Sequence, residues 1–234
     1  SVRESIAAME ALIEGGIDIV EVGVPYSDPL MDGPLIQRAT ELALDQGCQV
    51  DDVFTAVRAV ADGGSTAYVM TYWNLVLRRG VDRFAADLAT AGASGLITPD
   101  LIPDEAGEWI EAADRHELDR VFLVAPSSTR ERLTVATAAC RGFVYAASTM
   151  GVTGTRDSVG SAAAQVVERA REVTDLPLCV GLGVSTRAQA AEVAGYADGV
   201  IVGSALVRAL GEGGPAAVRT LTQELAAGVR EGRR

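Results

Sequence analysis

The amino-acid sequence predicts an α/β fold, a TIM or (β/α)₈ barrel whose first strand is missing from the N-terminus. Three observations support this expectation. Short apolar segments alternate with helical patterns through all 234 residues, which is typical of successive βα units. The strand segments are short and apolar, which favours a parallel sheet covered by helices. No linker or change of composition interrupts the alternation, so we expect one barrel domain over residues 1–234, N-terminally incomplete.

Helical spacing of apolar residues predicts the helices. In the first helix Ile6, Met9 and Ile13 follow this spacing, and a Gly-Gly pair ends it. Pro103 suits the first turn of its helix, and Ser185 is expected to cap another. The predicted helices cover residues 1–14, 34–46, 50–61, 81–91, 103–117, 129–139, 162–173 and 185–194, a short segment from 204, and 215–229.

Seven short runs between these helices predict strands, among them TAYVMT and RVFLVA. A closed (β/α)₈ barrel has eight strands. Because the first predicted element is a helix and the chain starts with Ser, we expect the absent strand to precede residue 1. The alternative is an open doubly wound sheet, which is less favoured because no GxGxxG turn follows the first strand. The predicted strands cover residues 17–22, 66–71, 95–98, 120–125, 142–147, 178–181 and 198–202.

Composition excludes several classes of function. The formal net charge of −12 argues against nucleic acid or an anionic membrane as a partner. No apolar run approaches the roughly 20 residues that span a bilayer, and no signal segment opens the chain. Three scattered cysteines without metal-ligand spacing predict free thiols in the cytoplasm and no metal site. With one histidine and no lysine, acid/base chemistry falls to carboxylates or tyrosine, and Schiff-base chemistry is excluded.

Glycine turns follow each of the last three predicted strands. They have the sequences GVTG, GLGVS and GS, at residues 151–154, 181–185 and 203–204. Backbone N–H groups at such turns and at a helix N-terminus can surround a phosphate without a cationic side chain. Each turn alone is weak evidence for a phosphate site, since a glycine in such a turn more often serves the backbone geometry than a ligand. Three at consecutive strand ends predict a phosphate site in an otherwise anionic protein.

An acidic loop follows the first predicted strand, in the segment IDIVEVGVPYSDPLMDG. Side chains alternate along a strand, so if Val20 and Val22 pack on helices, Glu21 points into the barrel mouth. Burial there would raise its pKa toward neutrality and suit it to proton transfer. Asp32, at the end of the loop, is the second candidate acid. The alternative is a structural ion pair at Glu21 and a loop that is only a tight turn.

The stretch VEVGVPYSDPLMDGP resembles the signature of the tryptophan synthase α subunit family, and the similarity continues in MTYWNLVLRRG, GVTG, GLGVS and DGVIVGSA. The resemblance implies a TIM barrel lyase that cleaves indole-3-glycerol phosphate to indole and glyceraldehyde 3-phosphate. It implies no cofactor in this subunit, and a tryptophan synthase β subunit as partner in an α2β2 complex. Tyr72 and Asn74 would lie where the loop that faces the partner begins.

The resemblance also implies roles for individual residues. Glu21 matches the general acid/base, Asp32 the carboxylate that binds the ring N–H, and Tyr145 a tyrosine near the glycerol portion. Thr153 matches a threonine of a loop that closes over the site. Met70 and Leu182 would line the indole slot, although both are equally explicable as core residues. The phosphate cup would consist of Gly154, Gly183, Gly203 and Ser204.

Two other functions remain open at this point. A related barrel enzyme could isomerise or epimerise another sugar phosphate, but such enzymes usually need paired Asp residues, a histidine or a metal. A non-catalytic chain could instead bind and activate a β subunit. A substrate panel distinguishes the first from the lyase, and stimulation of a β subunit without lyase activity distinguishes the second.

Overall fold

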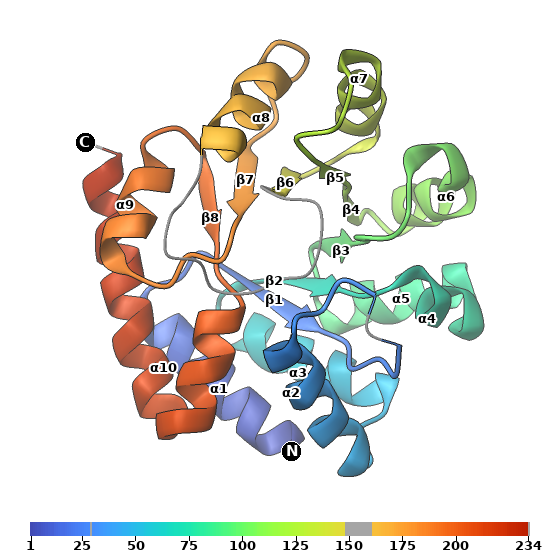
Figure 1. Cartoon of the computed structure of the whole chain (residues 1–234). Coiled ribbons are helices and arrows are strands. Elements are labelled where there is room, and N and C mark those ends of the chain that lie inside the picture. The colour runs from blue at the N-terminus through green and yellow to red at the C-terminus, as the bar shows by residue number, and fades with distance from the viewer. Residues whose placement is uncertain (29, 148–160, 234) are drawn as a thin grey trace.

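The computed structural model describes residues 1–28, 30–147 and 161–233, and its strands lie inside a ring of helices (Figure 1). The strands are β1 (Ile19–Gly23), β2 (Thr66–Met70), β3 (Gly95–Ile97), β4 (Asp119–Val121), β5 (Leu123–Val124), β6 (Val144–Ala147), β7 (Leu178–Gly181) and β8 (Gly199–Ile201). The helices are α1 (Val2–Gly15), α2 (Pro34–Asp45), α3 (Val50–Asp62), α4 (Trp73–Arg79), α5 (Val81–Ala91), η1 (Pro103–Glu105), α6 (Gly107–Arg115), α7 (Arg130–Ala139), α8 (Ser161–Arg171), α9 (Arg187–Ala194) and α10 (Ser204–Gly232).

Every strand pair in the described residues is parallel, as the alternation of strands and helices predicts. Hydrogen bonds link the strands in two runs, β1-β2-β3-β4 and β5-β6-β7-β8. The single strand expected over residues 120–125 is divided at Phe122, so that its two halves belong to different runs. All seven predicted strand positions are therefore confirmed, with the fourth in two parts.

The helix ends follow the local sequence in most places. Ser1 caps α1 in a capping box with Glu4, and Gly16 ends it in the left-handed conformation with φ 90°. The predicted cap at Ser185 is wrong by one residue, because the Thr186 hydroxyl accepts the hydrogen bond from the N–H of Gln189. The short helical segment predicted from residue 204 and the longer helix predicted over 215–229 merge as α10 across a kink at Gly214.

Helix α4 is the element that sequence patterns did not predict. Its seven residues follow β2 directly, and Gly80 ends it with φ 93°. Seven residues give only two turns, which is too short to show a helical period. The segment expected as one helix over residues 103–117 is instead the 3₁₀ turn η1 followed by α6.

The buried apolar residues form two groups, separated by the strands. The larger group fills the space between strands and helices and includes Val20 and Val22. The smaller group lies inside the ring of strands and is called here the interior cluster. Its members are Tyr68, Ile97, Val121 and Phe143, with Met70, Leu123, Tyr145, Cys179 and Ile201 packed against them.

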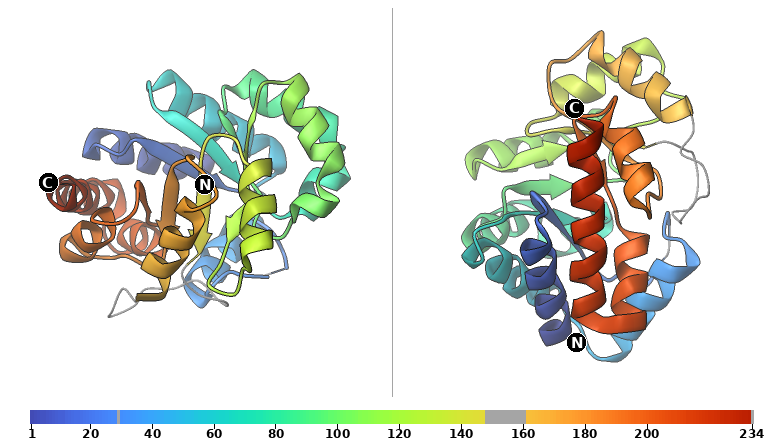
Figure 2. Two further views of the ribbon diagram at one scale, coloured as in Figure 1. Left: turned by 90° about the horizontal axis from the view of Figure 1, so that it is seen from above. Right: turned by 90° about the vertical axis from the view of Figure 1, so that its left-hand side faces the viewer.

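Helices α1, α9 and α10 pack together on one side of the molecule, where α10 runs alongside both of the others (Figure 2). A Cβ at Gly228 would overlap the Arg187 carbonyl, so this glycine permits close contact of α10 with the start of α9. In the described residues, no helix is long and apolar enough to cross a membrane.

Replacing Thr186 by Ala removes the cap of α9 and tests the corrected helix start. We expect the free energy of unfolding to fall by about 1 kcal/mol, as is usual for loss of an N-cap. Urea titration followed by circular dichroism measures the change. Thr186→Ser, which keeps the hydroxyl, should recover most of the lost stability; equal losses in both variants would contradict the assignment.

Candidate active site

Strand β1 places Glu21 on the inner side of the sheet. Val20 and Val22, its neighbours on either side, are 2% exposed and pack in the core between strands and helices. Because side chains alternate along a strand, Glu21 points the other way, into the space of the interior cluster. The orientation predicted from the sequence is therefore confirmed.

Burial dominates the electrostatics of Glu21. It raises the pKa of this carboxyl from 4.5 to about 7. The pKa of Tyr145 is raised mainly by burial and, to a smaller extent, by the Glu21 carboxylate. Burial and then Glu21 raise the pKa of Cys179 to about 12. Glu21 thus lies near a neutral phenol and a neutral thiol, and burial brings the pKa of its carboxyl close to neutral pH.

Two glycines make room for these neighbours of Glu21. A Cβ at Gly181 would overlap the hydroxyl of Tyr145 and approach its ring carbons Cε1 and Cζ to 2.8 Å. A Cβ at Gly199 would lie 2.5 Å from Sγ of Cys179. Strands β7 and β8 therefore lack side chains at the two points where the Tyr145 ring and the Cys179 thiol lie against them.

Asp32 is half-buried at the end of the loop that follows β1. Burial raises the pKa of its carboxyl, and a hydrogen bond from Tyr72 acts in the opposite direction. The Tyr72 hydroxyl also accepts the N–H of Met31 at 3.0 Å. The amide of Gln37 donates to the Asp32 carbonyl at 2.7 Å. Contacts with the start of α4 and with α2 thus fix the end of the loop.

The predicted phosphate cup is described in part. Gly183 adopts φ 76° in the turn after β7, which favours glycine. Gly203 and Ser204 stand at the start of α10, where the first backbone N–H groups of a helix lack partners within the helix. These three residues follow neighbouring strands, as expected. Thr153 and Gly154 lie outside the described residues.

The two predicted indole-lining residues occupy different surroundings. Met70 packs against the interior cluster. Leu182 is 5% exposed and belongs to the larger core, which includes the helix-facing residues. Tyr145 lies with Met70 at the interior cluster.

Sequence patterns missed Cys179 and Asp100, and the resemblance placed Tyr72 only at the start of the loop that faces the partner. Cys179 lies on an inward position of β7, which strand alternation alone could have indicated. Both carboxylate oxygens of Asp100 accept the N–H of Trp73, at 3.0 and 3.1 Å, at the start of α4. No local pattern links Tyr72 or Asp100 to the loop after β1, because their contacts join distant segments.

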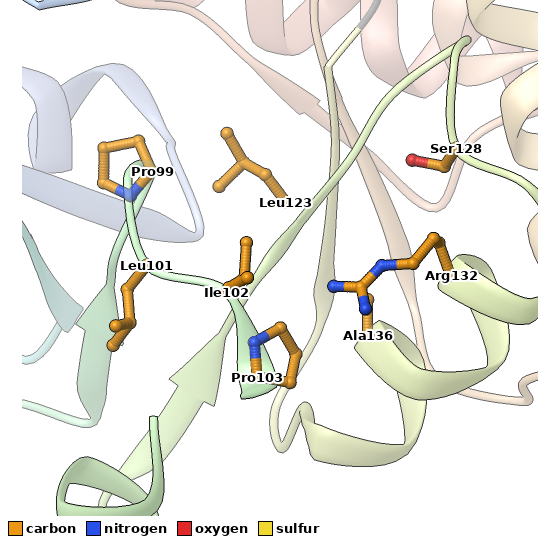
Figure 3. A pocket seen from close by; sticks show the side chains of 8 residues that line it. All are labelled: Pro99, Leu101, Ile102, Pro103, Leu123, Ser128, Arg132 and Ala136. Carbon is orange, nitrogen blue, oxygen red and sulfur yellow. The ribbon is translucent and has the colours of Figure 1, made fainter. Parts of the chain in front are cut away.

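A cavity of about 150 Å³ lies beside the interior cluster, with Leu123 shared between the two (Figure 3). Arg132 in its wall pairs with Asp104 at 2.8 Å, so the guanidinium charge is already balanced. Among the described residues no group of three or more His, Cys, Asp or Glu could hold a metal ion. The cavity is lined by Pro99, Leu101, Ile102, Pro103, Leu123, Ser128, Arg132 and Ala136.

Gly181→Ala tests the contact between β7 and Tyr145. The added methyl group must displace the Tyr145 ring beside Glu21, so we expect a loss of about 1–3 kcal/mol in the free energy of unfolding. Thermal and urea unfolding measure it. Gly107→Ala is the matched control, since a Cβ there meets nothing within 4 Å. Equal effects of the two substitutions would show that the ring is not confined.

Comparison with known proteins gives a consistent result for the whole chain. The family model "Tryptophan synthase alpha chain" matches residues 1–231. The tryptophan synthase alpha chain of Mycobacterium avium is 66% identical over 230 residues, which cover 98% of this chain and 85% of the relative. The tryptophan synthase alpha chain of Mycobacterium tuberculosis is 65% identical over 231 residues, which cover 99% of this chain and 85% of the relative.

Solved structures agree with the sequence relatives. A tryptophan synthase structure from M. tuberculosis superposes with a TM-score of 0.94 at 64% identity, covering 97% of this chain and 87% of that one. The tryptophan synthase α2β2 complex from Pyrococcus furiosus superposes with a TM-score of 0.89 at 33% identity, and the match covers 98% of this chain and 93% of that one. The predicted TIM barrel class is confirmed, and the chain belongs to the tryptophan synthase alpha chain family.

Proposed function

We propose that this chain is a carbon–carbon lyase that cleaves indole-3-glycerol phosphate to indole and glyceraldehyde 3-phosphate in tryptophan biosynthesis. The observation that carries the proposal is Glu21, an inward-facing carboxyl whose pKa burial raises to about 7. A group with this pKa can both give and take a proton near neutral pH. The family membership supports the same activity. We further propose one barrel domain over residues 1–234 and a cytoplasmic location.

The reaction requires a proton on indole carbon 3, so that the ring can accept the electrons of the breaking bond. We assign Glu21 to this transfer. The hydroxyl on the adjacent side-chain carbon loses its proton, its carbon becomes the aldehyde, and the bond to carbon 3 breaks. One proton leaves the hydroxyl and one is added to carbon 3, so the reaction exchanges no net proton with the solvent. This balance suits a single group that acts as both acid and base.

Positive charge develops at the ring nitrogen when carbon 3 is protonated. We assign the Asp32 carboxylate to the ring N–H, where it would stabilise this charge. Tyr145 would contact the glycerol portion, and Met70 and Leu182 the indole ring. The phosphate would bind at Gly154, Gly183, Gly203 and Ser204, and Thr153 would belong to a loop that closes over the site. No cofactor or metal is proposed for this chain.

We propose a tryptophan synthase β subunit as the partner, in an α2β2 complex. Solved relatives include such a complex from P. furiosus. Exposed apolar side chains also occur in the segments that follow the first three strands: Leu30 is 58%, Leu77 51% and Ile102 46% exposed. The loop after β1, α4 and the loop before η1 carry them, all at the carboxyl end of the barrel. Exposed apolar side chains on this end are consistent with a protein interface there.

An assay of indole release from indole-3-glycerol phosphate, with and without a β subunit, tests the proposal. We expect release by the chain and faster release in the complex. A panel of other sugar phosphates should give no product. Stimulation of the β subunit without indole release would overturn the lyase proposal and identify the chain as a non-catalytic activator.

A further inference from the structure

The loop between β1 and α2 is fastened at two points to the segment that begins α4. Near its end, the Tyr72 hydroxyl accepts the Met31 N–H at 3.0 Å and acts to lower the pKa of the neighbouring Asp32 carboxyl. Near its start, the Asn74 amide donates to the Tyr26 hydroxyl at 2.8 Å. The rings of Tyr26 and Tyr72 lie 5.6 Å apart at 43°. Residues two positions apart thus hold both ends of the acidic loop.

The Tyr72 hydroxyl has the hydrogen-bonding capacity to hold Met31 and Asp32 at once. A tyrosine hydroxyl has a single proton to donate. Because it accepts from the Met31 N–H, its proton remains available to the carboxylate of Asp32, the next residue of the loop. Hydrogen bonds to a charged acceptor are shorter and stronger than neutral ones. Tyr72 is 6% exposed, so little water competes for either bond.

Tyr72 is itself held in place from a third segment. Directly after it, the Trp73 N–H donates to both carboxylate oxygens of Asp100, from the loop after β3. A carboxylate at the first turn of a helix also favours that helix through its dipole. The start of α4 is therefore fixed before any ligand binds, and the tyrosine hydroxyl is presented to the loop.

We propose that Tyr72 is a positioning residue, which holds the Asp32 carboxylate in place for the ring N–H of the substrate. This inference rests on the proposed function, because Asp32 is assigned there to the ring nitrogen. The arrangement would be worth most when the positive charge develops, since a preorganised carboxylate needs no rearrangement at that moment. Tyr72 acts through Asp32 and takes no part in proton transfer.

Tyr72→Phe in the full chain with its β subunit is the main test. Phenylalanine keeps the ring packing and removes only the hydroxyl. We expect kcat and kcat/KM for indole release to fall together by about tenfold with KM unchanged, as for an interaction made in the transition state. Tyr68→Phe is the matched control, because it loses a similar bond, from the Tyr68 hydroxyl to Asp119 at 2.6 Å. Its kcat should stay within about twofold of the parent.

A double-mutant cycle separates positioning from a general structural effect. In an Asp32→Ala background the acceptor is absent, so Tyr72→Phe should change kcat by less than about twofold. Equal losses in the parent and in the Asp32→Ala background would overturn the proposal. So would a Tyr72→Phe variant with unchanged kcat.

Amide hydrogen exchange gives a readout that does not depend on activity. Loss of the hydroxyl should speed exchange in the loop after β1, at Met31 above all, while Tyr68→Phe leaves it unchanged. If the parent releases no indole, the proposed function fails, and faster exchange still supports the restraint on the loop. Unchanged exchange at Met31 in Tyr72→Phe would refute the restraint itself.

Discussion

Glu21→Gln is expected to lower kcat for indole release by about 10²–10⁴-fold, the usual contribution of a general acid or base, while indole-3-glycerol phosphate still binds. Glutamine keeps the size and shape of the side chain but cannot deliver a proton near neutral pH. The substrate dissociation constant should therefore change by less than about threefold, since most contacts with the ring and phosphate remain. Rapid-quench turnover measures the first quantity and calorimetry the second.

Asp18→Asn is the control for this experiment. Asp18 precedes β1 by one residue and is exposed, so Asp18→Asn changes a nearby carboxylate to an amide without touching the interior cluster. Its kcat should match the parent. Near-native turnover by Glu21→Gln would remove Glu21 from the mechanism and leave Asp32 as the only candidate acid.

The same substitution has a consequence for stability that depends on pH. Burial raises the pKa of Glu21 from 4.5 to about 7, so between these values the folded state binds more protons than the unfolded state. The contribution of Glu21 to stability is therefore complete below pH 4.5 and is lost as pH rises through 7. The full loss is about 3 kcal/mol.

Glu21→Gln cannot ionise and lacks this loss. Relative to the variant, the parent should become less stable by about 3 kcal/mol between pH 4.5 and pH 8. Urea unfolding of both proteins across this range measures the difference. Parallel stability profiles would show that Glu21 is solvated and would weaken its assignment as a proton donor. Buried ionisable groups at active sites often carry such a stability cost.

The sequence predicted the inward direction of Glu21 because that inference needs only strand alternation and two buried valines. The helix and strand positions were predictable for the same reason, since periodicity is a local property. The division of the fourth strand at Phe122 was not, because it depends on which neighbours pair with each half. The contact between Tyr72 and Met31 spans 41 positions in sequence, and no local pattern contains it.

The loop residues show the same limit within the site. Asp32 was recognisable from its motif, but its half-buried state depends on packing with Tyr72 and α2. Cys179 was predictable as an inward residue of β7, whereas its effect on the surroundings of Glu21 requires the missing side chain at Gly199. Chemical identity of the candidate acids is thus readable from the sequence, while their electrostatic environment arises from contacts between strands.

Trp109→Ala is expected to have the largest effect on stability, with a loss of about 3–5 kcal/mol in the free energy of unfolding. Trp109 lies on α6, is fully buried, and is the largest buried side chain of the described residues. Its removal leaves a cavity between α6 and the sheet that neighbouring side chains fill only partly. Urea unfolding at pH 6 measures the loss, with Trp73, the second tryptophan of the chain, as fluorescent reporter.

Trp109→Phe should cost less than half as much as Trp109→Ala. In the described residues the Trp109 Nε1 has no hydrogen-bond partner, and a buried unpaired donor costs about 1–3 kcal/mol. Phenylalanine removes that donor and keeps most of the ring volume, so the two effects offset each other. Trp73→Ala is the control, since Trp73 is only partly buried and should cost less than Trp109→Ala. If Trp109→Phe proves as damaging as Trp109→Ala, the indole nitrogen has a partner, and α6 is held by a polar contact as well as by packing.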